Sequence, residues 1–233
     1  MIVAEVESPT AGERSEHWMS GHLAEVAQGY QRILEGNPHH PRALMGMSLV
    51  ALASRQPEEA VLMAKAAVAA APELGAAWVT LGHALRTATR TEEAERAFGE
   101  AVRLDGMDSA ARAGLAELRL ATGRPEEAIK EYELASRREP TLVAAHLGLG
   151  HAQVWMERYD AALESYERAL TLCPRLPEGE FAAGFALARL GKSEEAEIRY
   201  RRALVERPDF AAAWMNLGCL LRELGGRSRP RLR

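Results

Sequence analysis

The chain has 233 residues, of which 47% are hydrophobic, so it can bury a large core. Its 29 Lys and Arg residues against 33 Asp and Glu residues give a formal net charge of -4. This balance argues against a nucleic-acid binder, because such proteins usually carry a basic excess. The two isolated cysteines, Cys173 and Cys219, exclude a disulfide framework and a cysteine-rich zinc module.

The N-terminal residues "MIVAEVESPTAGERSEHW" have no basic start and no long apolar run, so they do not indicate a secretory signal. The longest apolar stretch, "AVLMAKAAVAAAP", contains Lys65 and is too short to span a bilayer. With two unpaired cysteines, these features predict a cytoplasmic protein without a membrane segment. The abundance of Ala and Arg suggests a bacterial origin.

Prolines recur at a fixed spacing along the chain. Pro140, Pro174 and Pro208 are 34 residues apart, and Pro72 and Pro38 continue the same series towards the N-terminus. Residue 106, which lies 34 residues from both Pro72 and Pro140, is a glycine instead of a proline, so the spacing of the series continues through it. Such a period indicates a repeat architecture in which each unit packs on its neighbours.

Small and large residues follow the same phase. We number each repeat so that this proline is position 32, which starts full repeats at residues 41, 75, 109, 143 and 177 and a partial copy at 211. Positions 20 and 27 are Ala in every full repeat, and position 8 is always Ser, Gly or Ala. Position 24 reads Ala64, Phe98, Tyr132, Tyr166, Tyr200. Small residues are expected where two helices cross closely, with the large ones filling the space between them.

The segment "WVTLGHALRTATRTEEAERAFGEAV", residues 78–102, follows the pattern W-x2-L-G-x2-L…A-x3-F…A. At a period of 34 residues this pattern resembles the tetratricopeptide repeat (TPR), over about residues 41 to 224 with a partial copy before them. The resemblance implies an all-α, right-handed α-solenoid of stacked antiparallel helix pairs. The sequence departs from the pattern at Ala64, Arg112, His146 and Glu180.

In chain order, residues 1–20 are an N-terminal segment, interpreted as a degenerate first helix or as partly disordered, because Arg14 stands where Gly or Ala belongs. A single TPR solenoid domain is predicted over residues 21–224. It comprises a half repeat at 21–40, full repeats at 41–74, 75–108, 109–142, 143–176 and 177–210, and a terminal helix at 211–224. A basic tail follows at 225–233, interpreted as disordered rather than as a nucleic-acid contact.

Two amphipathic helices are expected in each full repeat, separated by a breaker such as Gly123 or Gly191. The second helix opens with "PEEA", "TEEA" or "SEEA", in which the glutamates complement the positive helix N-terminus. The terminal helix carries Trp214, Leu217, Leu220 and Leu221, which predicts an apolar face without its usual cover and possible self-association through this helix.

The stretch "HLGLGHAQVW", residues 146–155, could hold half of a phosphate-binding glycine loop. However, its third glycine is missing and no strand precedes it, so close helix packing at Gly148 and Gly150 is the favoured interpretation. His146 is interpreted as a core histidine with a satisfied ring, and His39 and His40 as residues of a solvated loop. No catalytic constellation and no metal spacing can be assembled, which predicts a non-enzymatic chain without cofactor or metal.

The TPR resemblance implies that positions 2, 5, 9, 12 and 13 of the first helices line a concave groove. An apolar and aromatic surface of this kind favours binding of a protein or peptide segment. His151 and Trp155 share one helix face there, and groove contact is weighed against ordinary solenoid surface. The predicted partner-binding residues are Met45, Leu49, Leu52, Val79, His83, Arg86, Glu117, Leu147, His151, Trp155, Phe181, Phe185, Arg189, Met215 and Arg222.

The leading hypothesis is therefore a protein–protein interaction scaffold that binds a partner peptide in an apolar groove. Capture of a chaperone C-terminus is rejected, because Met45, Leu49, Ala110 and Gly114 stand where Lys and Asn would be needed. The alternative is a substrate- or partner-recruiting segment of a larger bacterial enzyme of glycosyltransferase or methyltransferase type. The unfinished C-terminal repeat motivates this alternative, since arrays resembling this one occur joined to such domains in bacteria.

Overall fold

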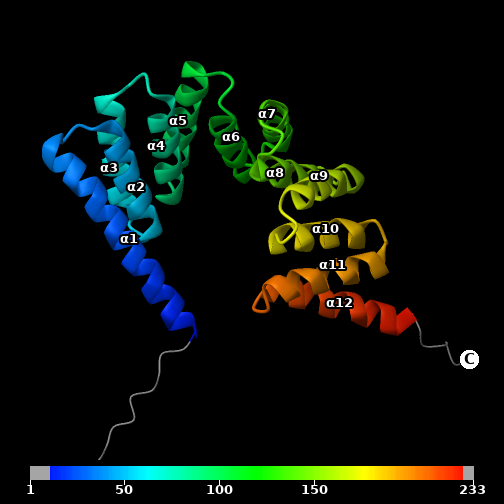
Figure 1. The fold of residues 1–233 in the computed structure, drawn as a ribbon. Coiled ribbons are helices and arrows are strands. Elements are labelled where there is room, and N and C mark those ends of the chain that lie inside the picture. Colours follow the sequence, from blue (N-terminus) through cyan, green and yellow to red (C-terminus); the bar gives the residue numbers. More distant parts are fainter. Residues whose placement is uncertain (1–10, 228–233) are drawn as a thin grey trace, which may run out of the picture. The chain divides into compact units, whose positions relative to one another are not determined.

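The computed structural model describes the backbone of residues 11–227 and the side chains of residues 22–224. Regular structure in this range is entirely helical (Figure 1). The helices are α1 (Ala11–Gly36), α2 (Pro41–Ala53), α3 (Pro57–Ala70), α4 (Gly75–Thr87), α5 (Thr91–Leu104), α6 (Ser109–Ala121), α7 (Pro125–Arg138), α8 (Val143–Trp155), α9 (Tyr159–Leu172), α10 (Pro177–Arg189), α11 (Ser193–Glu206) and α12 (Ala211–Arg227). The predicted all-α fold is confirmed.

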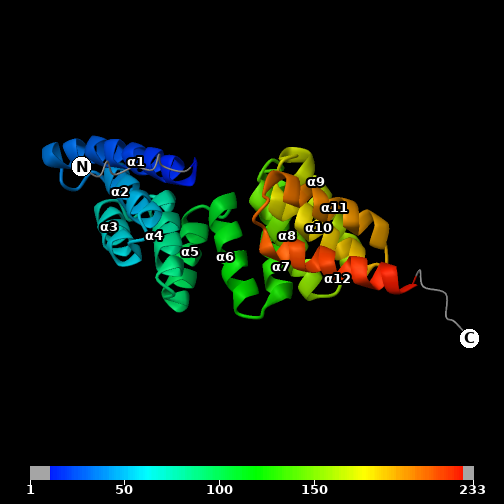
Figure 2. The ribbon, with the colours of Figure 1, turned by 90° about the horizontal axis from the view of Figure 1, so that it is seen from below.

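The helices form two compact units, Met1–Gly106 and Met107–Arg233. In the first unit, α2 pairs with α3, α4 pairs with α5, and α1 packs on α2. In the second, α6 pairs with α7, α8 with α9, and α10 with α11, on which α12 packs (Figures 1 and 2). The predicted antiparallel pairs are thus present in both units, while the single domain over residues 21–224 stays a prediction.

The N-terminal helix runs without interruption through the predicted boundary between residues 20 and 21. The part of the prediction that concerns residues 1–10 lies outside the described residues, as does the tail from residue 228 onwards. Among the described residues, no helix is both long and apolar enough to cross a membrane.

The second helices begin as their sequences predict. Pro57 and Pro125 occupy the first turns of α3 and α7, where a missing N–H removes no helical hydrogen bond. Paired glutamates lie in the first turns of α3, α5, α7 and α11, next to the unpaired N–H groups of the helix start. Two first helices have side-chain caps: Nδ1 of His40 accepts from the N–H of Ala43, and Oδ1 of Asp108 accepts from that of Ala111.

The five first helices of the full repeats end in the same left-handed turn, at position 15. Gly123 and Gly191 adopt φ values of 75° and 77° there, as the breaker pattern predicted. The same position is occupied by Arg55, Thr89 and Glu157 at φ 59°, 58° and 56°, a conformation that L side chains rarely adopt. In each turn, the N–H of the next residue donates a hydrogen bond to the carbonyl five residues earlier. The N–H of Arg90, for example, donates to the carbonyl of Leu85 at 2.9 Å, which satisfies a carbonyl at the helix end.

In three of the full repeats, the core is built where a glycine of the first helix meets the aromatic ring at position 24. A methyl group added to Gly82 would lie 2.7 Å from the Phe98 ring, and one added to Gly184 would lie 2.9 Å from the Tyr200 ring. A methyl group added to Gly150 would lie closer still to the Tyr166 ring. The alanines at positions 20 and 27 are fully buried in all five repeats. Only glycine therefore allows these helices to approach as they do.

Gly148 makes a second type of contact, with the aromatic residue of the preceding repeat. A methyl group at Gly148 would collide with the ring of Tyr132, and one at Gly46 would collide with the ring of Tyr30. Gly148 and Gly150 thus lie between Tyr132 and Tyr166. Their interpretation as packing glycines is confirmed, and the phosphate-loop alternative is excluded because the segment is a helix.

The terminal helix α12 differs in part from its prediction. Leu217 and Leu220 are buried against α10 and α11, whereas the sequence suggested that they lack cover. Trp214 and Leu221 are indeed exposed, at 57% and 40%. The difference arises because a first helix has two apolar sides, and the side that faces the preceding repeat is covered.

Candidate binding groove

The predicted groove residues lie on first helices that are neighbours within each unit. In the first unit α2 contacts α4, and in the second α6 contacts α8, α8 contacts α10, and α10 contacts α12. The first helices therefore form one layer in each unit, with the second helices packed against them. This arrangement gives each unit its own candidate surface.

In the first unit, the groove positions combine exposed and partly buried side chains. Leu49 on α2 is 53% exposed. Met45 is partly buried against the cluster of Leu44, Ala67 and Ala77. The remaining groove residues of this unit, all half-buried, are Leu52, Val79, His83 and Arg86.

His83 illustrates how the groove positions connect to the core. Its ring stands edge-on to Phe98, with the ring centroids 5.0 Å apart. Burial lowers the pKa of His83 below its ordinary value, and the nearby Arg86 charge lowers it further. The neutral imidazole is therefore favoured at neutral pH, where it presents one donor and one acceptor to the surface.

His151 repeats this arrangement in the second unit. Its ring makes a tilted edge contact with Tyr166, with the centroids 5.6 Å apart. His151 is exposed at the helix surface, and desolvation of the inner part of its ring lowers its pKa. Trp155, four residues later on α8, is 64% exposed. An indole left this open on a helix surface is typical of a contact residue rather than of a packing residue. Among the neighbouring groove positions, Glu117 is exposed and Leu147 is half-buried.

The structure brings Phe185 and Arg189 together at one cavity of about 160 Å³ between α10 and α12. The cavity is also lined by Tyr200, Asn216, Cys219 and Glu223, together with Ala188 and Leu220. The Arg189 guanidinium lies 4.9 Å from the centre of the Tyr159 ring, which orients this side chain at the rim. Met215 and Arg222 are exposed on the same helix α12, and an Arg222 nitrogen lies 3.7 Å from Sγ of Cys219.

Phe181 has a structural role that the sequence did not reveal. Its ring packs against Tyr200 and Phe210, with centroid distances of 5.8 and 4.9 Å, and it borders the buried cluster around Leu217. Phe210 in turn lies under the Arg207 guanidinium, 4.0 Å away. Phe181 is thus held in the α10–α12 core by one side of its ring.

Sequence reasoning missed Asn216 and Glu223 as cavity residues. Asn216 occupies position 6, where most other repeats carry a small residue, and Tyr200 makes a hydrogen bond to it. That exception in an otherwise small series was the signal that could have identified it. Glu223 lies one turn beyond Cys219 and adds an acidic side chain to the cavity lining.

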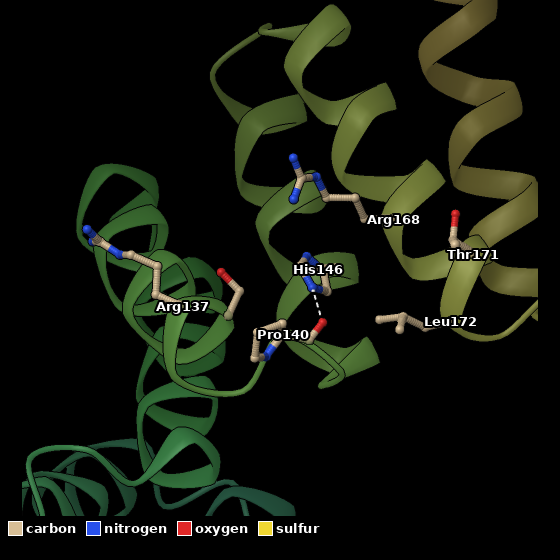
Figure 3. A pocket seen from close by; sticks show the side chains of 7 residues that line it. Arg137, Pro140, His146, Arg168, Thr171 and Leu172 are labelled. Carbon is tan, nitrogen blue, oxygen red and sulfur yellow. Dashed lines mark hydrogen bonds between the residues drawn. The ribbon is translucent and has the colours of Figure 1, made fainter.

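A second cavity, of about 370 Å³, lies at the ends of α7 and α9 (Figure 3). His146 forms one wall, and its Nε2 donates to the carbonyl of Pro140 at 2.9 Å. The interpretation of His146 as a satisfied core histidine is confirmed, since it replaces the indole N–H that Trp78 and Trp214 donate to the carbonyls of Pro72 and Pro208. The other lining residues are Ser136, Arg137, Arg168, Thr171 and Leu172.

Among the described residues, no three His, Cys, Asp or Glu side chains gather closely enough to hold a metal ion. His40 is occupied as the cap of α2, and the backbone N–H of His39 donates to Asn37. Both free cysteines lie apart, with Cys219 exposed and Cys173 partly buried. The chemistry that the described site offers is therefore apolar and aromatic contact with a few charged groups at its rim.

Comparison with known proteins agrees with this architecture. Two family models, both described as Tetratricopeptide repeat, match the chain. One matches residues 79–142 and 181–226, and the other matches residues 143–176. No curated protein matches the chain in sequence.

Solved structures share the fold at low sequence identity. TTC0263, a thermophilic TPR protein in Thermus thermophilus, is 19% identical with a TM-score of 0.66, covering 78% of this chain and 99% of its own. YrrB, described as a TPR protein with an unusual peptide-binding site, is 17% identical with a TM-score of 0.59. The match covers 82% of this chain and 98% of YrrB. MamA from Desulfovibrio magneticus RS-1 is 18% identical with a TM-score of 0.62, covering 73% and 97%.

The family models together match well over half of the chain, in the phase that the prolines and small residues define. The solved structures support the fold alone, because their identities are all below one fifth. The chain belongs to the tetratricopeptide repeat family.

Proposed function

We propose that this chain is a non-enzymatic scaffold that binds a partner peptide along its first helices, with apolar anchors on the ligand. TPR proteins generally mediate protein–protein interactions, and their repeat domains are typically non-catalytic. The observation that carries the proposal is the exposure of large apolar side chains at groove positions, above all Trp155 at 64% and Leu49 at 53%. The peptide-binding site named for YrrB supports the same class of ligand.

The ligand chemistry follows from the cavity between α10 and α12. Phe185 and Tyr200 offer aromatic walls for an apolar side chain, while Arg189 and Glu223 add opposite charges to the cavity lining. A peptide with a bulky apolar residue flanked by polar groups would satisfy both features. The cytoplasmic location and the bacterial origin stay predictions.

The experiment selects binders from a random peptide library displayed on phage and measures the affinity of the selected peptides by titration calorimetry. Leu49→Ala is expected to weaken the binding of peptides that dock on the first unit, and Trp155→Ala that of peptides that dock on the second, each by roughly tenfold or more, as hot-spot truncation does. Leu62→Ala on α3 is the matched control for Leu49→Ala, since Leu62 is 66% exposed but lies on a second helix. Equal affinities for all three variants would reject the groove.

Phe185→Ala tests the cavity itself, whereas Phe181→Ala would disturb the packing of Tyr200 and Phe210.

We also propose that the exposed side of α12 mediates self-association. Trp214 at 57%, Met215 at 65% and Leu221 at 40% exposure give this helix more open apolar surface than a typical first helix in this chain.

A further inference from the structure

The exposed side of α12 is the side that, in complete repeats, receives the second helix of the same repeat. Position 8 of α4, α8 and α10 is a glycine closed off by the aromatic ring at position 24. Position 8 of α12 is Gly218, and a methyl group placed there would meet nothing within 4 Å. Position 11 is buried at Leu85 and Leu187, both 2% exposed, but Leu221 is 40% exposed.

Helix α1 presents the opposite half of a repeat. Its residues are in the phase of a second helix, with Tyr30 at position 24. In complete repeats, positions 20 and 27 face the first helix and are fully buried alanines. On α1 these positions are Val26 and Ile33, which are 45% and 44% exposed. The described residues therefore place no first helix against this side of α1.

In four of the five full repeats, the side chains at positions 4 and 23 complement each other in charge or in size. The two positions meet in space, as the ion pairs Arg112–Glu131 and Glu180–Arg199 show. Where position 4 holds a large ring, position 23 is small: Ala97 accompanies Trp78, and Ser165 accompanies His146.

The two open helices obey this rule with each other. Position 4 of α12 is Trp214, and position 23 of α1 is Gly29, above which a methyl group would meet nothing within 4 Å. Position 8 of α12 is the open Gly218, and position 24 of α1 is Tyr30. If the two helices paired in this register, a ring would face a small residue twice, as in the internal repeats.

We propose that α12 of one copy and α1 of a second copy pair as the first and second helix of an intermolecular repeat, with Trp214 over Gly29 and Tyr30 against Gly218. This inference rests on the self-association proposed above and names its occupant. The contact joins two different surfaces, so each copy keeps one free end and the assembly extends head to tail. Val26, Ile33 and Leu221 become buried in the new contact.

Sedimentation equilibrium of the full chain tests the proposal. The average mass is expected to rise with concentration beyond that of two chains, because each added copy leaves another end open. Gly29→Arg and Gly218→Arg each place a charged side chain in one half of the contact, and each is expected to leave the chain monomeric. Gly36→Arg is the matched control, since Gly36 also lies on α1 with open space above it.

Mixing the two variants separates head-to-tail pairing from a symmetric contact. The Gly29→Arg chain keeps an intact α12 and the Gly218→Arg chain keeps an intact α1, so their mixture is expected to form a one-to-one complex that grows no further. Circular dichroism checks that each variant remains helical. A monomeric wild-type chain would overturn both this proposal and self-association through α12.

If Gly218→Arg abolishes association while Gly29→Arg does not, α12 mediates self-association but α1 is not its partner. Peptide binding by Leu49 and Trp155 is measured on the monomeric variants, so the groove proposal stands or falls independently.

Discussion

Arg112 on α6 and Glu131 on α7 form an ion pair at positions 4 and 23 of their repeat, and the same two positions carry the reversed charges in Glu180 and Arg199. Both pairs are largely buried, with side-chain exposures of 17% and 13% in the first and 9% and 20% in the second. An ion pair thus takes the place that Trp78 and Ala97 fill in another repeat. The departures from the repeat pattern at Arg112 and Glu180 are therefore compensated within the same repeat.

Glu131→Gln is expected to lower the free energy of unfolding by about 1–3 kcal/mol, because it leaves two partly buried arginines without their shared carboxylate. Glu131 accepts from Arg119 at 2.9 Å as well as from Arg112. The control is Glu100→Gln, which removes an exposed pair with Arg103 and is expected to change stability by less than about 1 kcal/mol. Urea unfolding measures both, and equal effects would contradict the structural role of Glu131.

The sequence predicted the fold well because small side chains leave a strong periodic signal. The phase of Gly82, Gly150 and Gly184 is enough to locate the helix crossings. It could not show that Arg112 pairs with Glu131, although opposite charges 19 residues apart occur twice and were available as a signal. Charges vary between repeats, so periodicity alone does not reveal such pairs.

The candidate groove was less predictable than the fold. Repeat register placed Phe181 and Phe185 on the same surface, but it could not show that Phe210 and Tyr200 hold the Phe181 ring. Likewise, register suggested that Leu217 lacks cover, whereas α12 buries it against the preceding repeat. These outcomes depend on neighbours from other positions in the repeat, which a single-position pattern does not contain.

Gly150→Ala is expected to destabilise the chain by about 1–3 kcal/mol, because the added methyl group would collide with the Tyr166 ring. The same substitution at Gly99 on α5 is expected to raise stability by about 0.5–1 kcal/mol, since nothing lies within 4 Å and alanine favours the helix. Thermal unfolding followed by circular dichroism compares the two. A stabilising Gly150→Ala change would show that the α8–α9 contact is looser than described.

Thr89→Gly is expected to stabilise the chain by about 1 kcal/mol, because Thr89 holds a φ of 58° that favours glycine. Gly123 occupies the same position one repeat later, so Gly123→Ala is expected to have the opposite effect. Ala88→Gly is the neighbouring control: at φ -77° it gains nothing from glycine and is expected to lose about 0.5–1 kcal/mol. The midpoints of urea unfolding rank the three variants. A Thr89→Gly variant no more stable than the parent would count against strain at this turn.

Acidification is expected to destabilise the chain through His83 and His151. Desolvation lowers the pKa of each imidazole in the folded chain below the ordinary value of 6.5, although His151 is exposed and His83 half-buried, and the Arg86 charge adds to this effect at His83. The unfolded chain therefore binds more protons than the folded chain between the folded and unfolded pKa values, so stability rises with pH across this window and is lost as pH falls below 6.5.

His83→Gln and His151→Gln should each reduce the drop in melting temperature between neutral and mildly acidic buffer, because glutamine takes up no proton in this range. Exposed His39, in the loop between α1 and α2, provides the control variant His39→Gln. If all three variants lose stability on acidification as steeply as the parent chain, carboxylates rather than the two groove histidines set the pH dependence. If only the groove variants flatten it, each histidine must be neutral in the folded chain, and its imidazole then offers both a donor and an acceptor to a bound peptide.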